Sequence, residues 1–360
     1  MSAGVTTPAV RPALRVGRLE ALRRRPLLLA GAGLLAVAAV FVAGVAFGHV
    51  PIAPADTLGV IMSRVLGWPQ VAYPAATETI IWELRLPRVV TAMIVGVGLA
   101  LAGATFQGLL RNPLADPYVL GTASGAALGA AVGLIVPVQL ALLGFGLLHL
   151  LAFGGALLAV GVVYRLARVG ATTSMTTVLL TGYAVGAMLA AALAVTMYLS
   201  GSSLRQIFTY LLGSFALSSW PQLAVGLPLV VLGSAVMLLR GRVLNAMLLG
   251  EESAAHLGVN VDRERKLLLG AATLATAAAV AMSGLIGFVG LVVPHLVRLV
   301  VGPNARVLLP LAAIFGAAFM GLADLLARIP GELPVGVVTA VVGAPFFLYL
   351  LRRYRAGYAL

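Results

Sequence analysis

Residues 88–110 read RVVTAMIVGVGLALAGATFQGLL, and the only charged side chain in this run is Arg88 at its first position. An α-helix needs about 20 apolar residues to cross the hydrocarbon core of a membrane. The run shows no alternation of apolar and polar residues, which a strand of a membrane β-barrel would require. It therefore predicts a membrane-spanning helix.

Similar apolar runs recur along the chain, so the sequence predicts about ten transmembrane helices. The other nine lie near residues 26–48, 119–137, 142–165, 175–199, 221–240, 265–283, 286–301, 307–327 and 334–351.

The composition of the 360 residues supports this fold class. Hydrophobic residues make up 61% of the chain and charged residues 10%, whereas soluble domains carry roughly 25% charged residues. The mean hydropathy is +1.07. In lipid the backbone must satisfy its own hydrogen bonds, which helices do. We expect an all-α polytopic membrane protein with one transmembrane domain over residues 26–352.

The chain lacks the residues that several kinds of chemistry require. The chain has no cysteine, its only lysine is Lys266, and no phosphate-binding G-x-x-x-x-G-K-[ST] loop occurs. The four histidines are scattered without metal-ligand spacing. We expect no enzymatic activity, no metal and no cofactor on this chain, and any ATP with its Mg²⁺ would be used by a separate ATPase.

The net charge of +13 follows the expected topology. With both termini in the cytoplasm, 19 of the 24 basic residues lie inside, as the positive-inside rule requires. The five outside are Arg64, Arg85, Arg88, Arg205 and Arg328. Topology accounts for the charge without a nucleic-acid partner, and the protein is predicted to be multi-pass in the cytoplasmic (inner) membrane, surrounded by lipid.

Residues 1–25 form a basic cytoplasmic extension that ends in Arg23, Arg24 and Arg25. A signal peptide is the alternative, but the following apolar run is long and residues 45–48 are a poor cleavage context. We expect the first span to be retained. Residues 353–360 are predicted to be a cytoplasmic tail.

Arg85, Arg88 and Arg328 are expected on the outer side, where topology does not favour them. Their guanidinium groups suit carboxylates of a docking protein. The alternatives are contact with lipid phosphates or pairing with Glu83 and Glu332. Pro87 is expected to mark the start of the second span.

The longest predicted cytoplasmic segment covers residues 241–266. Leu244–Leu257 is expected to be one amphipathic helix that ends at Gly258, a C-cap glycine. Its apolar face requires a partner.

The last third of the chain contains a predicted helix break. The glycines of residues 283–291 and Pro294 interrupt an apolar run at membrane depth, which is tolerated only against protein or a water-filled cavity. Ionisable residues inside the spans are few, and Asp324 and His295 are the nearest candidates for a proton relay. This pattern favours a transporter that obtains its energy from a partner over an ion-coupled carrier or a membrane-embedded enzyme.

Five motifs resemble a known family. They are LRLPR (84–88), GATFQGLLRNPLADP (103–117), GLIGFVGLVVPH (284–295), RVLLP (306–310) and GELPVGVVTAVVGAP (331–345). In this order and spacing they resemble the permeases of ABC importers for iron-siderophores, haem and vitamin B12 (FecCD/BtuC-like, type II). The resemblance covers roughly residues 50–352.

The resemblance implies a homodimer, two cytoplasmic ABC ATPase subunits and an extracytoplasmic substrate-binding protein. It implies that Arg85, Arg88 and Arg328 dock the binding protein and that a coupling helix near 244–258 contacts the ATPase. The implied coupling residues are Leu249, Gly250, Glu251, Glu252, Ala254, Leu257 and Gly258. The implied cytoplasmic gate comprises Asn112, Pro113, Leu114, Thr172, Ser174, Met175 and Thr176, and Gly182 and Gly186 are expected to line the pathway.

These motifs do not distinguish substrates. We rank an iron chelate first, either an iron-siderophore or haem, and cobalamin second.

Overall fold

The computed structural model describes residues 25–48, 50–67, 73–138, 140–142, 144–168, 175–329 and 331–358. Helices occupy all ten predicted spans. They are α2 (Pro26–Ala46), α5 (Leu86–Leu109), α6 (Thr122–Ile135), α7 (Leu147–Leu166), α8 (Met175–Tyr198), α10 (Trp220–Leu239), α13 (Val261–Ser283), α14 (Val289–Val301), α15 (Ala305–Arg328) and α16 (Val335–Tyr358).

Eight of these helices in the described part are long and apolar enough to cross a membrane, while α6 and α14 are shorter, with 14 and 13 residues. The predicted all-α polytopic membrane fold is confirmed. The expected tail is partly helical, since α16 continues to Tyr358.

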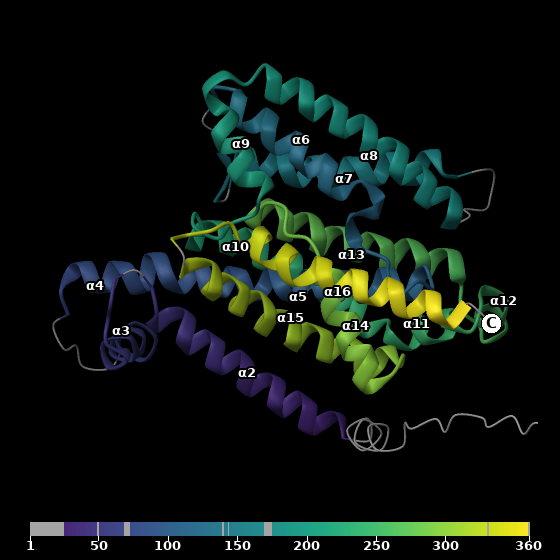
Figure 1. Cartoon of the computed structure of the whole chain (residues 1–360), viewed down its shortest axis with the longest axis horizontal. Helices are drawn as coiled ribbons and strands as arrows, with labels where there is room; N and C mark the ends of the chain where they lie inside the picture. Colours follow the sequence, from purple (N-terminus) through teal and green to yellow (C-terminus); the bar gives the residue numbers. More distant parts are fainter. Residues whose placement is uncertain are drawn as a thin grey trace, which may run out of the picture.

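Helix α5 lies at the centre of the bundle and packs against α10, α13, α14 and α15. Helices α6, α7 and α8 form a second group, which joins the first where α6 and α7 pack on α13 (Figure 1). Helices α5 and α13 are therefore largely buried, whereas α2, α8 and α16 lie at the periphery.

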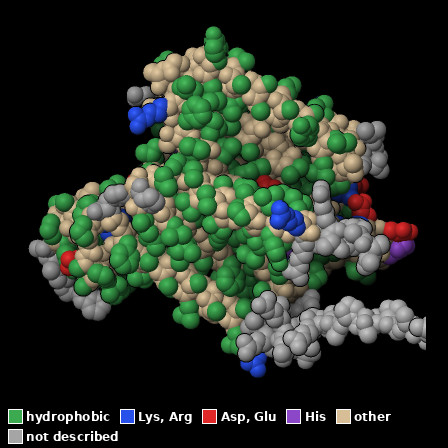
Figure 2. All heavy atoms as spheres, viewed as in Figure 1, with side chains coloured by type: hydrophobic (Ala, Val, Ile, Leu, Met, Phe, Trp, Pro, Cys, Tyr) green, Lys and Arg blue, Asp and Glu red, His purple; other side chains and the backbone are tan. Residues whose placement is uncertain are grey.

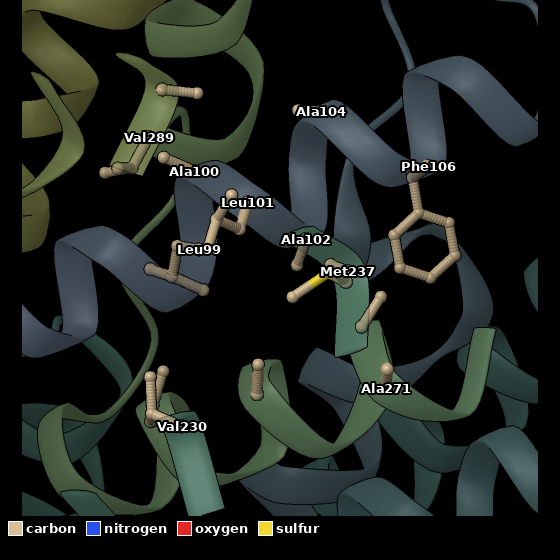
Figure 3. Packing of buried hydrophobic residues seen from close by; sticks show 14 of the residues in the cluster. Leu99, Ala100, Leu101, Ala102, Ala104, Phe106, Val230, Met237, Ala271 and Val289 are labelled. Carbon is tan, nitrogen blue, oxygen red and sulfur yellow. The ribbon is translucent and has the colours of Figure 1, made fainter. Parts of the chain in front are cut away.

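Small side chains let the central helices approach closely. Ala272 and Ala275 of α13 are fully buried. Met237 of α10 lies beside Ala102 of α5 (Figure 3). Helices in lipid associate through such close van der Waals packing, since burial of apolar surface gives little gain there.

The sides of the bundle are apolar. Leu27, Leu35 and Leu239 are each more than 70% exposed in the single chain. Figure 2 shows hydrophobic side chains over the helix flanks, with most of the visible acidic and histidine side chains at one end. This surface suits lipid or a second subunit and does not suit water.

Short elements mark the two ends of the bundle (Figure 1). The α12 end carries α11 (Gly241–Leu248), α12 (Glu251–His256) and, after α5, the 3-10 helix Pro117–Leu120. The α3 end carries α3 (Pro54–Leu66), α4 (Ala75–Thr79), a 3-10 turn Gly201–Ser203, α9 (Leu204–Leu211) and an antiparallel hairpin of β1 (Ala141–Leu142) and β2 (Phe145–Gly146). This hairpin occupies the residues where the fourth span was expected to begin.

Pro87 lies in the first turn of α5, as predicted, but the helix does not begin there. A π-helical segment, Ile80–Arg85, joins α4 to α5, so helix runs without a stop from Ala75 to Leu109. The N–H of Leu86 bonds to the carbonyl of Ile81, five residues back. The wider turn lets the helix pass a proline, which has no N–H to donate.

The predicted break in the last third is confirmed at residues 284–288, which are not helical, but Pro294 lies inside α14. Proline at this position cannot donate to the carbonyl of Gly290, four residues back. The side-chain amide of Gln107 on α5 donates to that carbonyl at 3.3 Å. Helix α14 therefore continues through its proline because α5 supplies the missing donor.

Candidate functional site

Arg85, Arg88 and Arg328 lie at the α3 end, and all three are buried, with 6%, 9% and 6% of their surface exposed. Arg85 ends the π-helical segment, Arg88 lies in the first turn of α5 and Arg328 ends α15. Buried guanidinium groups need charge partners or hydrogen-bond acceptors. Arg88 and Arg328 pair with carboxylates, whereas Arg85 donates to main-chain carbonyls.

Asp324 joins two of the arginines. Its Oδ1 accepts from Nε of Arg88 at 3.0 Å, and its Oδ2 accepts from Nε of Arg328 at 3.0 Å and also from Nη2. Asp324 is 1% exposed. Both carboxylate oxygens are thus held by guanidinium groups, an arrangement that disfavours a proton-relay role for this residue.

Glu332 is the accessible member of this cluster. Its carboxylate accepts from Nη1 of Arg88 at 2.8 and 3.1 Å, and 42% of its side-chain surface is exposed. Its backbone has a φ of 63°, a conformation that costs energy for a residue other than glycine. Because the Glu332 side chain is partly exposed, the Arg88–Glu332 pair lies at the surface of an otherwise buried cluster.

Arg85 is bound by main-chain carbonyls. Its Nη1 donates to Val45 at 3.0 Å and to Ala46 at 2.8 Å, and its Nη2 donates to Val50. These contacts tie the end of α2 to α5. The sequence suggested that these arginines could pair with Glu83 or Glu332. Arg88 pairs with Glu332, while no salt bridge among the described residues involves Glu83. Docking by the arginines stays a prediction.

The expected single helix Leu244–Leu257 is wrong: α11 and α12 are separate. Gly250 lies between them with a φ of 122°, which a residue with a Cβ rarely adopts. Gly258 also has a positive φ of 81°, as expected of a glycine that ends a helix.

The predicted coupling residues surround this break. Ala254 is buried, Glu251 and Glu252 begin α12, and Leu249 and Leu257 are 70% and 66% exposed. Exposed leucines beyond the ends of the spans, on a segment with charged neighbours, leave an apolar surface without a partner in the single chain.

Three side chains tie this segment to the spans. The side chain of Asn245 donates to Asn304 at 2.8 Å and accepts from the N–H of Ala305 at 2.7 Å. Arg111, after α5, donates to the carbonyl of Met247 at 3.1 Å. Arg265 of α13 pairs with Glu251. Through these three contacts a displacement of α11 and α12 would be transmitted to α15, α5 and α13.

Sequence reasoning did not assign these three ties. Asn245 was visible as an amide among apolar residues, which is a weak signal. Its partner lies 59 residues away, and only the packing of α11 on α15 brings the two together.

Asn112, Pro113 and Leu114 form the turn after α5, where the N–H of Leu114 donates to Oδ1 of Asn112 at 3.0 Å. Met175 and Thr176 begin α8, and Thr172 and Ser174 lie outside the described residues. The turn after α5 and the start of α8 both lie at the α12 end of the bundle.

Asp116 follows this turn and caps the 3-10 helix by accepting from the N–H of Tyr118 at 2.8 Å. Burial raises the pKa of the Asp116 carboxyl to about 6, against the lowering effect of that hydrogen bond.

Gly182 and Gly186 of α8 face inward. A Cβ at Gly182 would lie 2.6 Å from the carbonyl oxygen of Val119. The nearest atoms to a Cβ at Gly186 belong to Ser124 and Gly121. In the single chain Gly182 allows α8 to approach the residues just before α6, whereas a Cβ at Gly186 would make ordinary contact. The exposed face of α8 carries Tyr183 and Met188. Their assignment to the pathway stays a prediction.

Comparison with known proteins identifies relatives along most of the chain. A model of the FecCD transport family matches residues 34–353. A cobalamin import system permease protein, BtuC, from Halobacterium salinarum is 45% identical over 303 residues, 81% of each chain. A hemin transport system permease protein, HmuU, from Yersinia pestis is 43% identical over 281 residues, 76% of this chain and 84% of that one.

A solved structure, described as an inward-facing conformation of a metal-chelate type ABC transporter, is also similar. It shares 31% sequence identity with a TM-score of 0.77, covering 91% of this chain and 99% of that chain.

Proposed function

The chain belongs to the FecCD transport family and is the permease of an ABC importer, and from that premise we propose that it moves a large metal chelate from a substrate-binding protein into the cytoplasm. An iron chelate, either an iron-siderophore or haem, is the first candidate. Cobalamin is the second, supported by the relative from Halobacterium salinarum. Two copies of the chain would form the pathway, and two separate ATPase subunits would bind ATP and Mg²⁺.

The observation that carries this proposal is the surface of α11 and α12. Leu249 and Leu257 offer an apolar surface beyond the spans, and the ties through Asn245, Arg111 and Arg265 link that surface to three helices. A short helical segment that inserts into a groove of an ATPase would move as a rigid body with it. We place this end in the cytoplasm, where most of the arginines are expected.

Capture of the ATPase tests this contact. Leu249→Ser with Leu257→Ser removes two large apolar side chains from the proposed interface, each a contribution of about 1.5–3 kcal/mol when buried. We expect the purified double variant to bind the ATPase at least tenfold more weakly. Leu217→Ser, at a still more exposed leucine of the α3 end, is the control. Equal binding by all three proteins would refute the assignment.

We propose that docking of the binding protein requires an exchange of partners, because Arg88 and Arg328 already pair with carboxylates and Arg85 already donates to main-chain carbonyls. We propose that a carboxylate of the binding protein displaces Glu332 from Arg88. Glu332 is the exposed acid of the cluster, so it leaves into solvent at little cost, whereas Asp324 stays buried between Arg88 and Arg328. Arg85 and Arg328 would then position Arg88 and supply positive potential.

Removing the competing carboxylate tests the exchange. Glu332→Gln removes the carboxylate that competes for Nη1 of Arg88, so an incoming carboxylate can bind there more readily. The affinity for the binding protein should rise by several-fold. Glu83→Gln removes the same charge from an exposed residue of the same end and controls for long-range electrostatics. An equal effect of the two substitutions, or a loss of affinity in Glu332→Gln, would contradict the exchange.

The pathway is proposed to run along the exposed face of α8, with Gly182 and Gly186 setting the distance of that helix from α6. Asn112, Pro113, Leu114, Met175 and Thr176 would narrow the cytoplasmic opening, together with Thr172 and Ser174.

The substrate is tested by the ligands that the binding protein captures and by uptake into proteoliposomes that contain the whole complex. We expect uptake of an iron chelate that stops without ATP. Uptake of cobalamin alone would favour the second candidate. Uptake that survives without ATP and stops with an uncoupler would instead indicate an ion-coupled carrier.

A further inference from the structure

Helices α2 and α14 both pack on α15, and between them lies an apolar groove of about 330 Å³. Figure 1 shows α2 at the edge of the bundle, with α15 and α14 beside it. All thirteen side chains that line the groove are apolar, among them Leu29, Ala36 and Val40 of α2, Val297 of α14 and Phe319 of α15. The groove opens on the apolar flank of the bundle beside the peripheral helix α2, so an apolar molecule of the membrane can reach it.

The groove extends over one leaflet. Along α2 it runs from Leu29 to Val40, eleven residues apart, which at 1.5 Å per residue is about 16 Å. The hydrocarbon core of a bilayer is about 30 Å thick. The groove thus begins at the α12 end and reaches about the middle of the membrane, the depth of a single acyl chain.

Positive charge lies at the mouth of this groove. Arg25 is exposed and is the N-cap residue of α2, four residues before Leu29, so it lies at the end of α2 where the groove begins. The neighbouring walls carry Arg298 at the end of α14 and Arg306 at the start of α15. Residues 25–29 and 298–306 contain no acidic side chain.

We propose that this groove binds an acyl chain of an anionic phospholipid from the leaflet on the α12 side, with the phosphate group paired to Arg25. Apolar walls one leaflet long and a basic rim match the two parts of such a lipid. The lipid would fill the space between α2 and α14 and hold α2 against the bundle.

Lipid binding to the purified chain tests the proposal. Phosphatidylglycerol and phosphatidylcholine are titrated against the detergent-solubilised protein and the complexes are counted by native mass spectrometry. Ala36→Phe fills part of the groove, so the acyl chain buries about two fewer methylene groups there. We expect the affinity for phosphatidylglycerol to fall about tenfold. Ala39→Phe places the same ring on the exposed face of α2 and is expected to bind like the wild type. Wild-type affinity in Ala36→Phe would overturn the proposal.

Two further variants test the headgroup and the nature of the occupant. Arg25→Gln should abolish the preference for phosphatidylglycerol over phosphatidylcholine, and a retained preference would remove Arg25 from the site. Because the chain has no cysteine, Ala36→Cys and Ala39→Cys each provide a unique thiol. A disulfide-linked dimer formed at position 36 and not at position 39 would show that a second copy fills the groove, against the proposal.

Discussion

At the residue scale, Asp324 is the acid on which the buried arginines depend. It holds Arg88 and Arg328 at once, and removal of one partner of a buried ion pair costs about 3–5 kcal/mol because the other charge stays buried. We predict that Asp324→Asn strongly lowers the thermal stability of the solubilised protein. Glu332→Gln, which removes a half-exposed carboxylate, should lower it much less, and similar losses in the two variants would contradict this account.

Asp116 gives a pH-dependent prediction. Burial raises the pKa of its carboxyl from 3.8 to about 6 in the folded chain, so the folded state binds the proton more tightly than the unfolded state. The ionised form therefore destabilises the fold, and stability falls as pH rises through the range from about 4 to 6. Asp116→Asn should raise the melting temperature at pH 7.5 and leave it nearly unchanged at pH 4. An equal gain at both values would refute the prediction.

At the scale of the element, α11 and α12 are short helices whose position depends on contacts with longer ones. Asn245 contributes two hydrogen bonds to the start of α15, each worth about 0.5–1.5 kcal/mol. We predict that Asn245→Ala keeps ATPase capture and lowers the amount of substrate moved per ATP hydrolysed. The measurement is coupled uptake and ATPase activity of the reconstituted complex.

Asn260→Ala is the control for this prediction, because the side chain of Asn260 caps α13 by accepting from the N–H of Arg263, a hydrogen bond within its own segment. If both variants lose coupling to the same extent, the effect belongs to local stability and not to the Asn245 tie.

At the scale of the whole molecule, the orientation in the membrane is the property that both proposed interfaces share. The cysteine-free chain allows single thiols at exposed positions of opposite ends, Leu217→Cys and Leu257→Cys. In intact cells that lack the ATPase, a membrane-impermeant maleimide should label position 217 alone and should reach position 257 only after permeabilisation. The reverse pattern would place α11 and α12 outside and refute both interfaces.

Much of the fold was predictable because its signal is local. The length of an apolar run is read from consecutive residues, and all ten predicted spans correspond to helices. The family motifs are local as well. The sequence did not show that helix continues through Pro87 and Pro294. It does so once by a π-helical turn and once because Gln107 of another helix supplies the missing donor.

The sequence by itself determined that this chain is a multi-pass helical membrane protein and a permease by family, since composition and motif order need no long-range contact. The tertiary structure alone decided which charges meet. Asp324 lies 236 residues from Arg88, and Glu332 lies 244 residues from it, so no local pattern identifies these pairs. The packing of α5 on α15 buries Arg88 and Arg328 and brings the carboxylates to them. These partners are required because a buried guanidinium without a partner is energetically costly.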